Sequence, residues 1–259
     1  MRIYLIIDET SFFQPDFIAD FLKRTTDKVV GAALVVKVPE KNNIDLYLRR
    51  HWYFLRLNEI CKLLILKLRY VFKNILRINN SRQGFSSVES VFQFFGIPYS
   101  LVQWDINQDK YLANIRTAKP DVIISSNSLI FGDELLNIPK ICCLNRHSAL
   151  LPSFGGLWPV FQAVRCDESF TGVSVHTMEK KIDQGVILAQ TKIKIDEEDS
   201  VTDLYEKCFA VSANVVLEAL NKIRKQDLSP VQQTNRPCYF SFPAKEHWRE
   251  FRQKNKKFI

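Results

Sequence analysis

The stretch Ile141-Cys142-Cys143-Leu144-Asn145-Arg146-His147 runs from four apolar residues directly into polar ones. A short apolar run of this kind predicts a buried strand, and the polar residues mark its end. Ligands of open α/β sheets bind beyond the carboxyl ends of the strands. Asn145 and His147 therefore fall where a functional site is expected.

The same pattern recurs through the preceding part of the chain, where apolar runs alternate with segments of helical spacing. The predicted strands are Ile3–Ile7, Val29–Val36, Tyr99–Val102 and Val122–Ser125, and the predicted helices are Phe12–Arg24, His51–Ile78, Ser87–Phe95 and Lys110–Thr117. This alternation favours an α/β fold in which a mostly parallel central sheet carries helices on both faces.

The pattern changes after the glycines at 155 and 156. The sequence predicts two further strands, Thr171–Met178 and Val186–Ile195, followed by a long helix, Asp199–Arg224. It predicts that Gln226–Pro243 wraps the surface and that Asn79–Ser87, earlier in the chain, is a polar loop. We expect residues 1–225 to form one domain and residues 226–259 to form a tail that packs on it.

The net charge of +8 is concentrated in one segment. Residues 49–82 hold nine Lys or Arg and one acid, Glu59, so this segment alone nets +8. We interpret it as a basic helical insertion. Localised positive charge indicates an anionic partner, unless it is simply a solvated helix face.

The predicted helix in this insertion carries apolar residues on both faces. Seven form one stripe at helical spacing, namely Tyr53, Leu57, Ile60, Leu64, Leu68, Val71 and Ile75. The helix either packs onto the sheet, with cationic stems covering apolar surface, or meets a membrane surface or a partner chain. The sequence does not decide between these two interpretations. It also allows the chain to form a homodimer.

A cytoplasmic location is expected for the chain. The first apolar run ends at Asp8, which is too short for a signal-peptide core. Six cysteines in a chain of 259 residues without such a signal suggest reduced thiols.

The polar residues after the run at 141–144 suit acyl-group chemistry. An amide at Asn145 offers N–H donors, and an imidazole at His147 changes its charge near neutral pH. A carboxylate from elsewhere would orient the imidazole, and the turn Asp183-Gln184-Gly185 could present one. Such groups stabilise a developing oxyanion and move a proton.

Four separated pieces of the sequence together resemble the 10-formyltetrahydrofolate-dependent formyltransferase family. They are the N-x-H of Asn145 to His147, the L-L-P of Leu150 to Pro152 with its following glycine, Thr171-Gly172-Val173-Ser174-Val175-His176, and the D-x-G of Asp183 to Gly185. The resemblance is good over residues 121–204 and holds only in outline for the N-terminal half. It implies a Rossmann-like fold, in agreement with the predicted sheet.

The resemblance implies a role for each matching residue. Asn145 would bind the formyl oxygen as it gains negative charge, His147 would stabilise the same intermediate as imidazolium, and Asp183 would hold His147 and relay a proton. His176 would have a supporting role. The formyl donor would be 10-formyltetrahydrofolate, and the resemblance implies no metal. The residues that bind the folate would be Ser125, Ser126, Asn127, Leu129, Leu151, Pro152 and Gly185.

Three acceptor amines are compatible with the resemblance. Glycinamide ribonucleotide would need a glycine-rich phosphate loop, but Asp8-Glu9-Thr10-Ser11 stands in that place. Initiator methionyl-tRNA would need a further domain, whereas only a helix and a tail follow the core, so nucleic acid is not the expected partner. A nucleotide-linked amino sugar fits best by elimination, as an anionic small molecule. Two hypotheses name a function of another class. In one the chain hydrolyses the folate donor, and in the other it is a docking module without enzyme activity.

Overall fold

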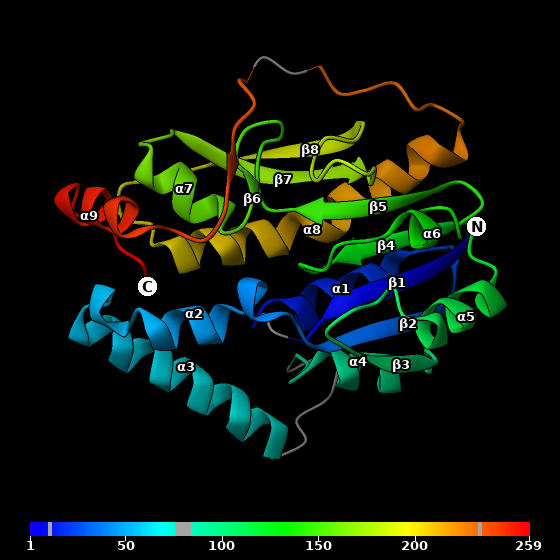
Figure 1. Cartoon of the computed structure of the whole chain (residues 1–259), viewed down its shortest axis with the longest axis horizontal. Coiled ribbons are helices and arrows are strands. Elements are labelled where there is room, and N and C mark those ends of the chain that lie inside the picture. The colour runs from blue at the N-terminus through cyan, green and yellow to red at the C-terminus, as the bar shows by residue number, and fades with distance from the viewer. Residues whose placement is uncertain (10–11, 76–83, 233–234) are drawn as a thin grey trace.

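The computed structural model describes residues 1–9, 12–75, 84–232 and 235–259. Its main sheet has seven strands in the order β3-β2-β1-β4-β5-β7-β8 (Figure 1). Neighbouring strands from β3 to β5 pair in parallel, and β7 and β8 add antiparallel. Their bounds are β1 Arg2–Asp8, β2 Lys28–Lys37, β3 Tyr99–Gln103, β4 Val122–Ser126, β5 Cys142–His147, β7 Phe170–Thr177 and β8 Ile187–Lys194. The predicted, mostly parallel α/β sheet is confirmed.

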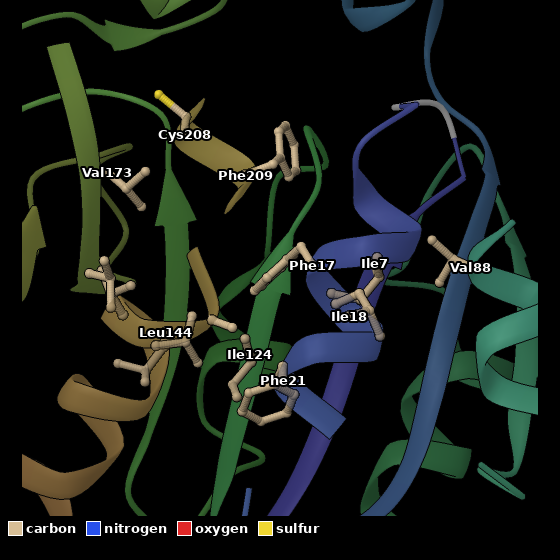
Figure 2. Close-up of a cluster of buried hydrophobic side chains, with 14 of the residues drawn as sticks. Ile7, Phe17, Ile18, Phe21, Val88, Ile124, Leu144, Val173, Cys208 and Phe209 are labelled. Atoms are coloured by element: carbon tan, nitrogen blue, oxygen red, sulfur yellow. The ribbon is translucent and has the colours of Figure 1, made fainter. Parts of the chain in front are cut away.

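Alternate residues of β1, β2, β4 and β5 supply two separate cores. Ile3, Leu5 and Ile7 of β1 pack with α1 (Gln14–Arg24), α4 (Val88–Phe94) and α8 (Val201–Arg224) on one face. Tyr4 and Ile6 face the other side, toward α5 (Asp109–Ala118) and α6 (Asp133–Leu136). Figure 2 shows the first core, where Phe17 and Phe21 of α1 lie between β1 and α8. Full burial on both faces explains why these strands read as continuous apolar runs.

The predicted helix His51–Ile78 is wrong in its first turns. The structure has α2 (Ile44–Arg50), a 3-10 turn η2 (Trp52–Phe54) and then α3 (Leu57–Ile75). The backbone N–H of Arg56 donates to the Glu59 carboxylate at 2.8 Å, which caps the start of α3. Residues 76–78, and residues 79–83 of the predicted loop, lie outside the described part of the chain.

The chain after α8 packs back onto the core. Trp248 and Phe251 of α9 (Lys245–Gln253) are buried against α7 (Pro159–Arg165). The indole N–H of Trp248 donates to the Tyr47 hydroxyl at 2.6 Å, and that hydroxyl donates to the Pro243 carbonyl at 2.7 Å. These bonds tie α2 to the tail. No helix in the described part of the chain is long and apolar enough to cross a bilayer.

Candidate active site

β5 continues further than predicted and carries the polar residues itself. The expected strand ended at Leu144, but β5 extends to His147 because Asn145, Arg146 and His147 pair with β7. Asn145 and His147 therefore face the same side of the sheet. Arg146 points the opposite way and is buried, with its guanidinium 3.9 Å from the centre of the Phe209 ring.

Asp183 reaches this side of the sheet from the turn between β7 and β8. Its backbone is left-handed (φ 55°), and its Oδ2 accepts a hydrogen bond from the Gly156 N–H at 2.7 Å. Gly185 lets the turn close, because a Cβ there would lie 1.7 Å from the Thr177 carbonyl oxygen. The turn thus places a nearly buried carboxylate beside the strand.

Four side chains meet at this point. Nδ1 of His147 lies 4.0 Å from Oδ2 of Asp183, and Nε2 of His176 lies 3.6 Å from Oδ1. Nε2 of His176 also lies 3.3 Å from the Nδ2 atom of Asn145, its partner in the β5–β7 register. The structure therefore brings the three predicted catalytic residues together and adds His176 as the link between two of them.

Backbone carbonyls fix the tautomers of both histidines. Nε2 of His147 lies 3.0 Å from the Phe154 oxygen, and Nδ1 of His176 lies 2.8 Å from the Thr177 oxygen. A carbonyl oxygen only accepts, so each of these nitrogens carries a proton. In neutral His147 the free lone pair is then on Nδ1, which faces Asp183 and is available to take a proton.

Burial and charge act in opposite directions at this cluster. Burial lowers the pKa of the His147 imidazole, although the nearby Asp183 carboxylate partly opposes this. Burial would raise the pKa of Asp183, but His147, His176 and the Gly156 N–H outweigh it and hold that pKa well below its usual range. The resting site therefore pairs a charged carboxylate with an imidazole that favours its neutral form, whereas the resemblance implied an imidazolium.

The loop after β5 is held by two side chains of the antiparallel strands. The Ser174 hydroxyl donates to the Ala149 oxygen at 2.6 Å and accepts from the Leu151 N–H at 3.1 Å. The Gln190 amide donates to the Leu151 oxygen at 3.0 Å. This bonding fixes the segment between His147 and Gly156, and with it the carbonyl and N–H groups that bind His147 and Asp183.

The predicted folate residues stand at the end of β4 or after it, in the loop after β5, or in the turn that carries Asp183. Ser125 pairs in register with Asn145, and Asn127 holds its own loop through bonds to the Ile6 oxygen at 2.9 Å and the Leu129 N–H at 2.8 Å. Ser126 is buried and accepts from Gln14. Leu129 and Leu151 are buried, while Pro152 and Gly185 are partly exposed. The set borders the carboxyl ends of β4 and β5, with some side chains already used inside the protein.

Two residues of the tail, Tyr239 and Phe240, pair with the loop whose Gly156 N–H binds Asp183. β9 (Tyr239–Phe240) pairs in parallel with β6 (Gly155–Gly156), where the Gly155 N–H donates to the Cys238 oxygen at 2.9 Å. A Cβ added at Gly155 would lie 3.4 Å from both the Tyr239 ring and the Asp183 Cβ, so these two side chains flank Gly155. Burial raises the pKa of Tyr239, and the Asp183 carboxylate adds to this effect. The ring is still 57% exposed. It is an uncommitted aromatic surface beside the cluster.

The described residues contain no group of three or more His, Cys, Asp or Glu that could hold a metal ion. The chemistry available from them is hydrogen bonding by Asn145, proton transfer at Nδ1 of His147 and charge stabilisation by Asp183.

Known proteins resemble the chain in the same region. The sequence model described as "Formyl transferase" matches residues 88–220, just over half of the 259-residue chain. Methionyl-tRNA formyltransferase of Borrelia duttonii is 35% identical over 134 residues, which are 51% of this chain and 43% of that protein. The bifunctional polymyxin resistance protein ArnA of Wigglesworthia glossinidia brevipalpis is 36% identical over 132 residues, 51% of this chain and 20% of that protein. The chain thus spans less than half the length of these relatives.

Solved structures share the fold at lower sequence identity. A sugar N-formyltransferase from Shewanella superposes with a TM-score of 0.56 at 16% identity, covering 93% of this chain and 77% of that one. A phosphoribosylglycinamide formyltransferase from Anaplasma phagocytophilum superposes with a TM-score of 0.60 at 16% identity, covering 92% of this chain and 97% of that one. Both likenesses bear on the fold alone.

Proposed function

Because the chain belongs to the formyl transferase family, we propose that it transfers a formyl group from 10-formyltetrahydrofolate to a primary amine. The observation that carries this proposal is the meeting of Asn145, His147 and Asp183, with His176, at the carboxyl end of β5. We assign the reaction to the domain expected over residues 1–225, with the tail 226–259 completing its site.

The hydrogen-bonding groups of the cluster suit a formyl group. The amide N–H of Asn145 is a donor that stabilises negative charge on a carbonyl oxygen. The donor supplies an activated formyl carbon on a nitrogen leaving group, and the residues Ser125, Ser126, Asn127, Leu129, Leu151, Pro152 and Gly185 would hold it. These residues border the cluster, so the formyl group could be presented to it.

Each member of the cluster then has one task. Asn145 donates to the formyl oxygen as that atom becomes negative. Nδ1 of His147 takes the proton that the attacking amine loses, since its Nε2 is already bound to the Phe154 oxygen. Asp183 stabilises the imidazolium so formed, and the Gly156 N–H keeps the carboxylate in place. The bond between the formyl carbon and the folate nitrogen then breaks, and the imidazolium gives its proton to that nitrogen, which leaves as tetrahydrofolate. His176 positions Asn145 and Asp183.

We propose a nucleotide-linked amino sugar as the acceptor. The segment after β1 does not resemble a phosphate loop, because the Glu9 carboxylate itself occupies the backbone N–H groups of Val88 and Glu89 at the start of α4. The exposed ring of Tyr239 would give a nucleobase or sugar a surface for stacking.

The six cysteines are unpaired, which supports a cytoplasmic location.

Methionyl-tRNA is the second candidate acceptor. Methionyl-tRNA formyltransferases are 33% to 37% identical to this chain over about half its length, and the basic insertion could contact phosphates. Hydrolysis of the donor without any amine is the alternative of another class.

The test is an acceptor panel. The purified protein is mixed with 10-formyltetrahydrofolate and, in separate reactions, nucleotide-linked amino sugars, methionyl-tRNA, glycinamide ribonucleotide or no amine. Mass spectrometry identifies the formylated product. Formylation of an amino sugar supports the proposal, formylation of methionyl-tRNA or glycinamide ribonucleotide transfers it to that acceptor, and release of formate without amine contradicts it in favour of hydrolysis.

A further inference from the structure

The far side of α3 presents an apolar stripe that no described part of the chain covers. Leu57, Leu68 and Phe72 are 78%, 67% and 63% exposed, and Leu64 and Ile65 are exposed as well. On a helix of 3.6 residues per turn, these five side chains fall within an arc of about 100°. Three members of the stripe predicted from the sequence, Leu57, Leu64 and Leu68, are therefore exposed and do not pack onto the sheet.

The opposite side of α3 is the one that anchors the helix. Glu59 is buried and binds Arg252 of α9, and it also accepts from the Phe258 N–H at 3.1 Å. Leu63 packs against the first core. Figure 1 shows α3 beyond α2, away from the faces of the sheet. The anchoring through Glu59 and Leu63 thus turns the stripe away from the protein.

Positive charge borders the stripe on both sides. On the helical wheel Lys62 falls on one flank and Lys67 on the other, and both side chains are exposed. Arg49, Arg50 and Arg56 are exposed nearby. Glu59 is the only acid between residues 46 and 72, and its charge is buried with Arg252. The exposed charged side chains described between residues 46 and 72 are therefore all basic; of these, Arg50 pairs with Glu40 and Lys62 donates to the Ile259 oxygen at 3.2 Å.

Aromatic residues and more cations lie at the start of the helix. Trp52 and Tyr53 of η2 are both exposed. A hollow of about 220 Å³ beside Tyr53 is lined by Phe54, Lys245, Trp248, Arg249 and Arg252. Trp and Tyr favour the boundary between lipid headgroups and acyl chains, and clustered Lys and Arg favour anionic headgroups.

We propose that the stripe of α3, with Trp52 and Tyr53, binds the surface of an anionic lipid bilayer. The helix would lie in the plane of the interface, its leucines and Phe72 among the acyl chains and its lysines reaching up to the headgroups. This inference does not rest on the proposed formyl transfer.

The same charges argue against a second copy of the chain as the occupant. Two copies meeting through this stripe would face each other with the cations that flank it, and like charges at an interface cost binding free energy. An anionic surface satisfies the apolar stripe and the charges together.

Vesicle flotation tests the proposal with the full chain. We expect the protein to float with vesicles of equal parts phosphatidylglycerol and phosphatidylcholine, much less with phosphatidylcholine alone, and less again at high salt. Replacing Lys62 and Lys67 by Ala should weaken partitioning about 30-fold, at about 1 kcal/mol for each cation near an anionic surface.

Serine at Leu64, Leu68 and Phe72 should abolish flotation. A matched control places serine at Leu101 and Ile141, which are exposed apolar residues of other segments, and should float normally. The wild type should show a blue shift in tryptophan fluorescence with anionic vesicles, and Trp52→Phe should lose it. Equal loss in the control variant, or no flotation of the wild type, would overturn the proposal. The proposal would also be overturned if the wild type formed a concentration-dependent dimer in sedimentation, and if the variant with serine at Leu64, Leu68 and Phe72 lost this dimer while the control variant kept it.

Discussion

Nδ1 of His147 and Oδ2 of Asp183 lie 4.0 Å apart, which is longer than a hydrogen bond. Both atoms are acceptors while His147 is neutral, because its single proton is on Nε2 and bound to the Phe154 oxygen. When Nδ1 gains a proton it becomes a donor aimed at the carboxylate. The pair is therefore arranged to stabilise the protonated state of His147.

Asp183→Asn removes that stabilisation and keeps the shape of the side chain. We expect the turnover number to fall by roughly 10²–10⁴-fold, the usual contribution of positioned acid–base groups. The asparagine oxygen can still accept from Gly156, so thermal unfolding should change little. The measurement is steady-state release of tetrahydrofolate, and an unchanged turnover number would contradict the role given to Asp183.

His147 should make stability depend on pH. Burial lowers its pKa in the folded protein below the value of about 6.5 in the unfolded chain. The contribution of neutral His147 to the free energy of unfolding is fully present above about pH 6.5. It is lost as pH falls through the folded pKa, because the unfolded chain binds the proton more readily.

The measurement is urea unfolding of the wild type and His147→Gln at several pH values. We expect the free energy of unfolding of the wild type to fall more steeply on acidification than that of the variant. His51→Gln, a histidine outside the cluster, serves as the matched control. Parallel curves for wild type and His147→Gln would show that the imidazole is not held in its neutral form.

Gly156→Ala should break the contact between the site and the tail. The residue has φ 93°, and an added Cβ would lie 2.0 Å from the Phe240 carbonyl oxygen. We expect a loss of at least about 2 kcal/mol in the free energy of unfolding, together with lower activity, because Asp183 depends on the Gly156 N–H.

Gly96→Ala is the control for backbone strain alone. This residue has φ 65° but nothing within 4 Å of the added Cβ, so we expect a cost of only about 1 kcal/mol and unchanged turnover. Equal effects of the two substitutions in urea unfolding would mean that the pairing of β6 with β9 contributes little.

Tyr239 should affect the acceptor more than the folate. Tyr239→Ala is expected to raise KM for the acceptor about tenfold, which corresponds to one lost stacking contact, and to leave KM for the donor unchanged. Tyr239→Phe should retain the wild-type values. Tyr53→Ala, which removes an equally exposed ring from η2, is the control in vesicle-free assays. A rise in KM for the donor alone would assign the ring to folate binding.

The sheet could be predicted from sequence because its strands are buried on both faces. The runs that begin at Ile3, Val29 and Val122 are continuous and apolar, and each appears in the structure with ends shifted by at most one residue. β5 was underestimated because Asn145 and His147 are polar, although their backbones pair normally with β7. Side-chain polarity signals the site, whereas backbone pairing sets the strand length.

The missed elements depend on contacts between distant residues. The segment at 239–240 becomes a strand only because Gly155 and Gly156 offer backbone partners, and α9 is held by the bond from Trp248 to Tyr47 of α2. His176 could have been ranked higher, since it occupies the strand position opposite Asn145. The aromatic segment 238–243 stands out in the sequence, but the place of Tyr239 beside Gly155 and Asp183 arises only from the folding-back of the tail.

The most direct measurement follows the formyl carbon itself. Donor carrying a ¹³C-labelled formyl group is mixed with the acceptor panel and with wild-type protein, His147→Ala or His51→Ala. We predict that the label appears on the nitrogen of an amino sugar with the wild type and His51→Ala, and not with His147→Ala. Label in no amine, or equal labelling by His147→Ala, would contradict formyl transfer by this cluster.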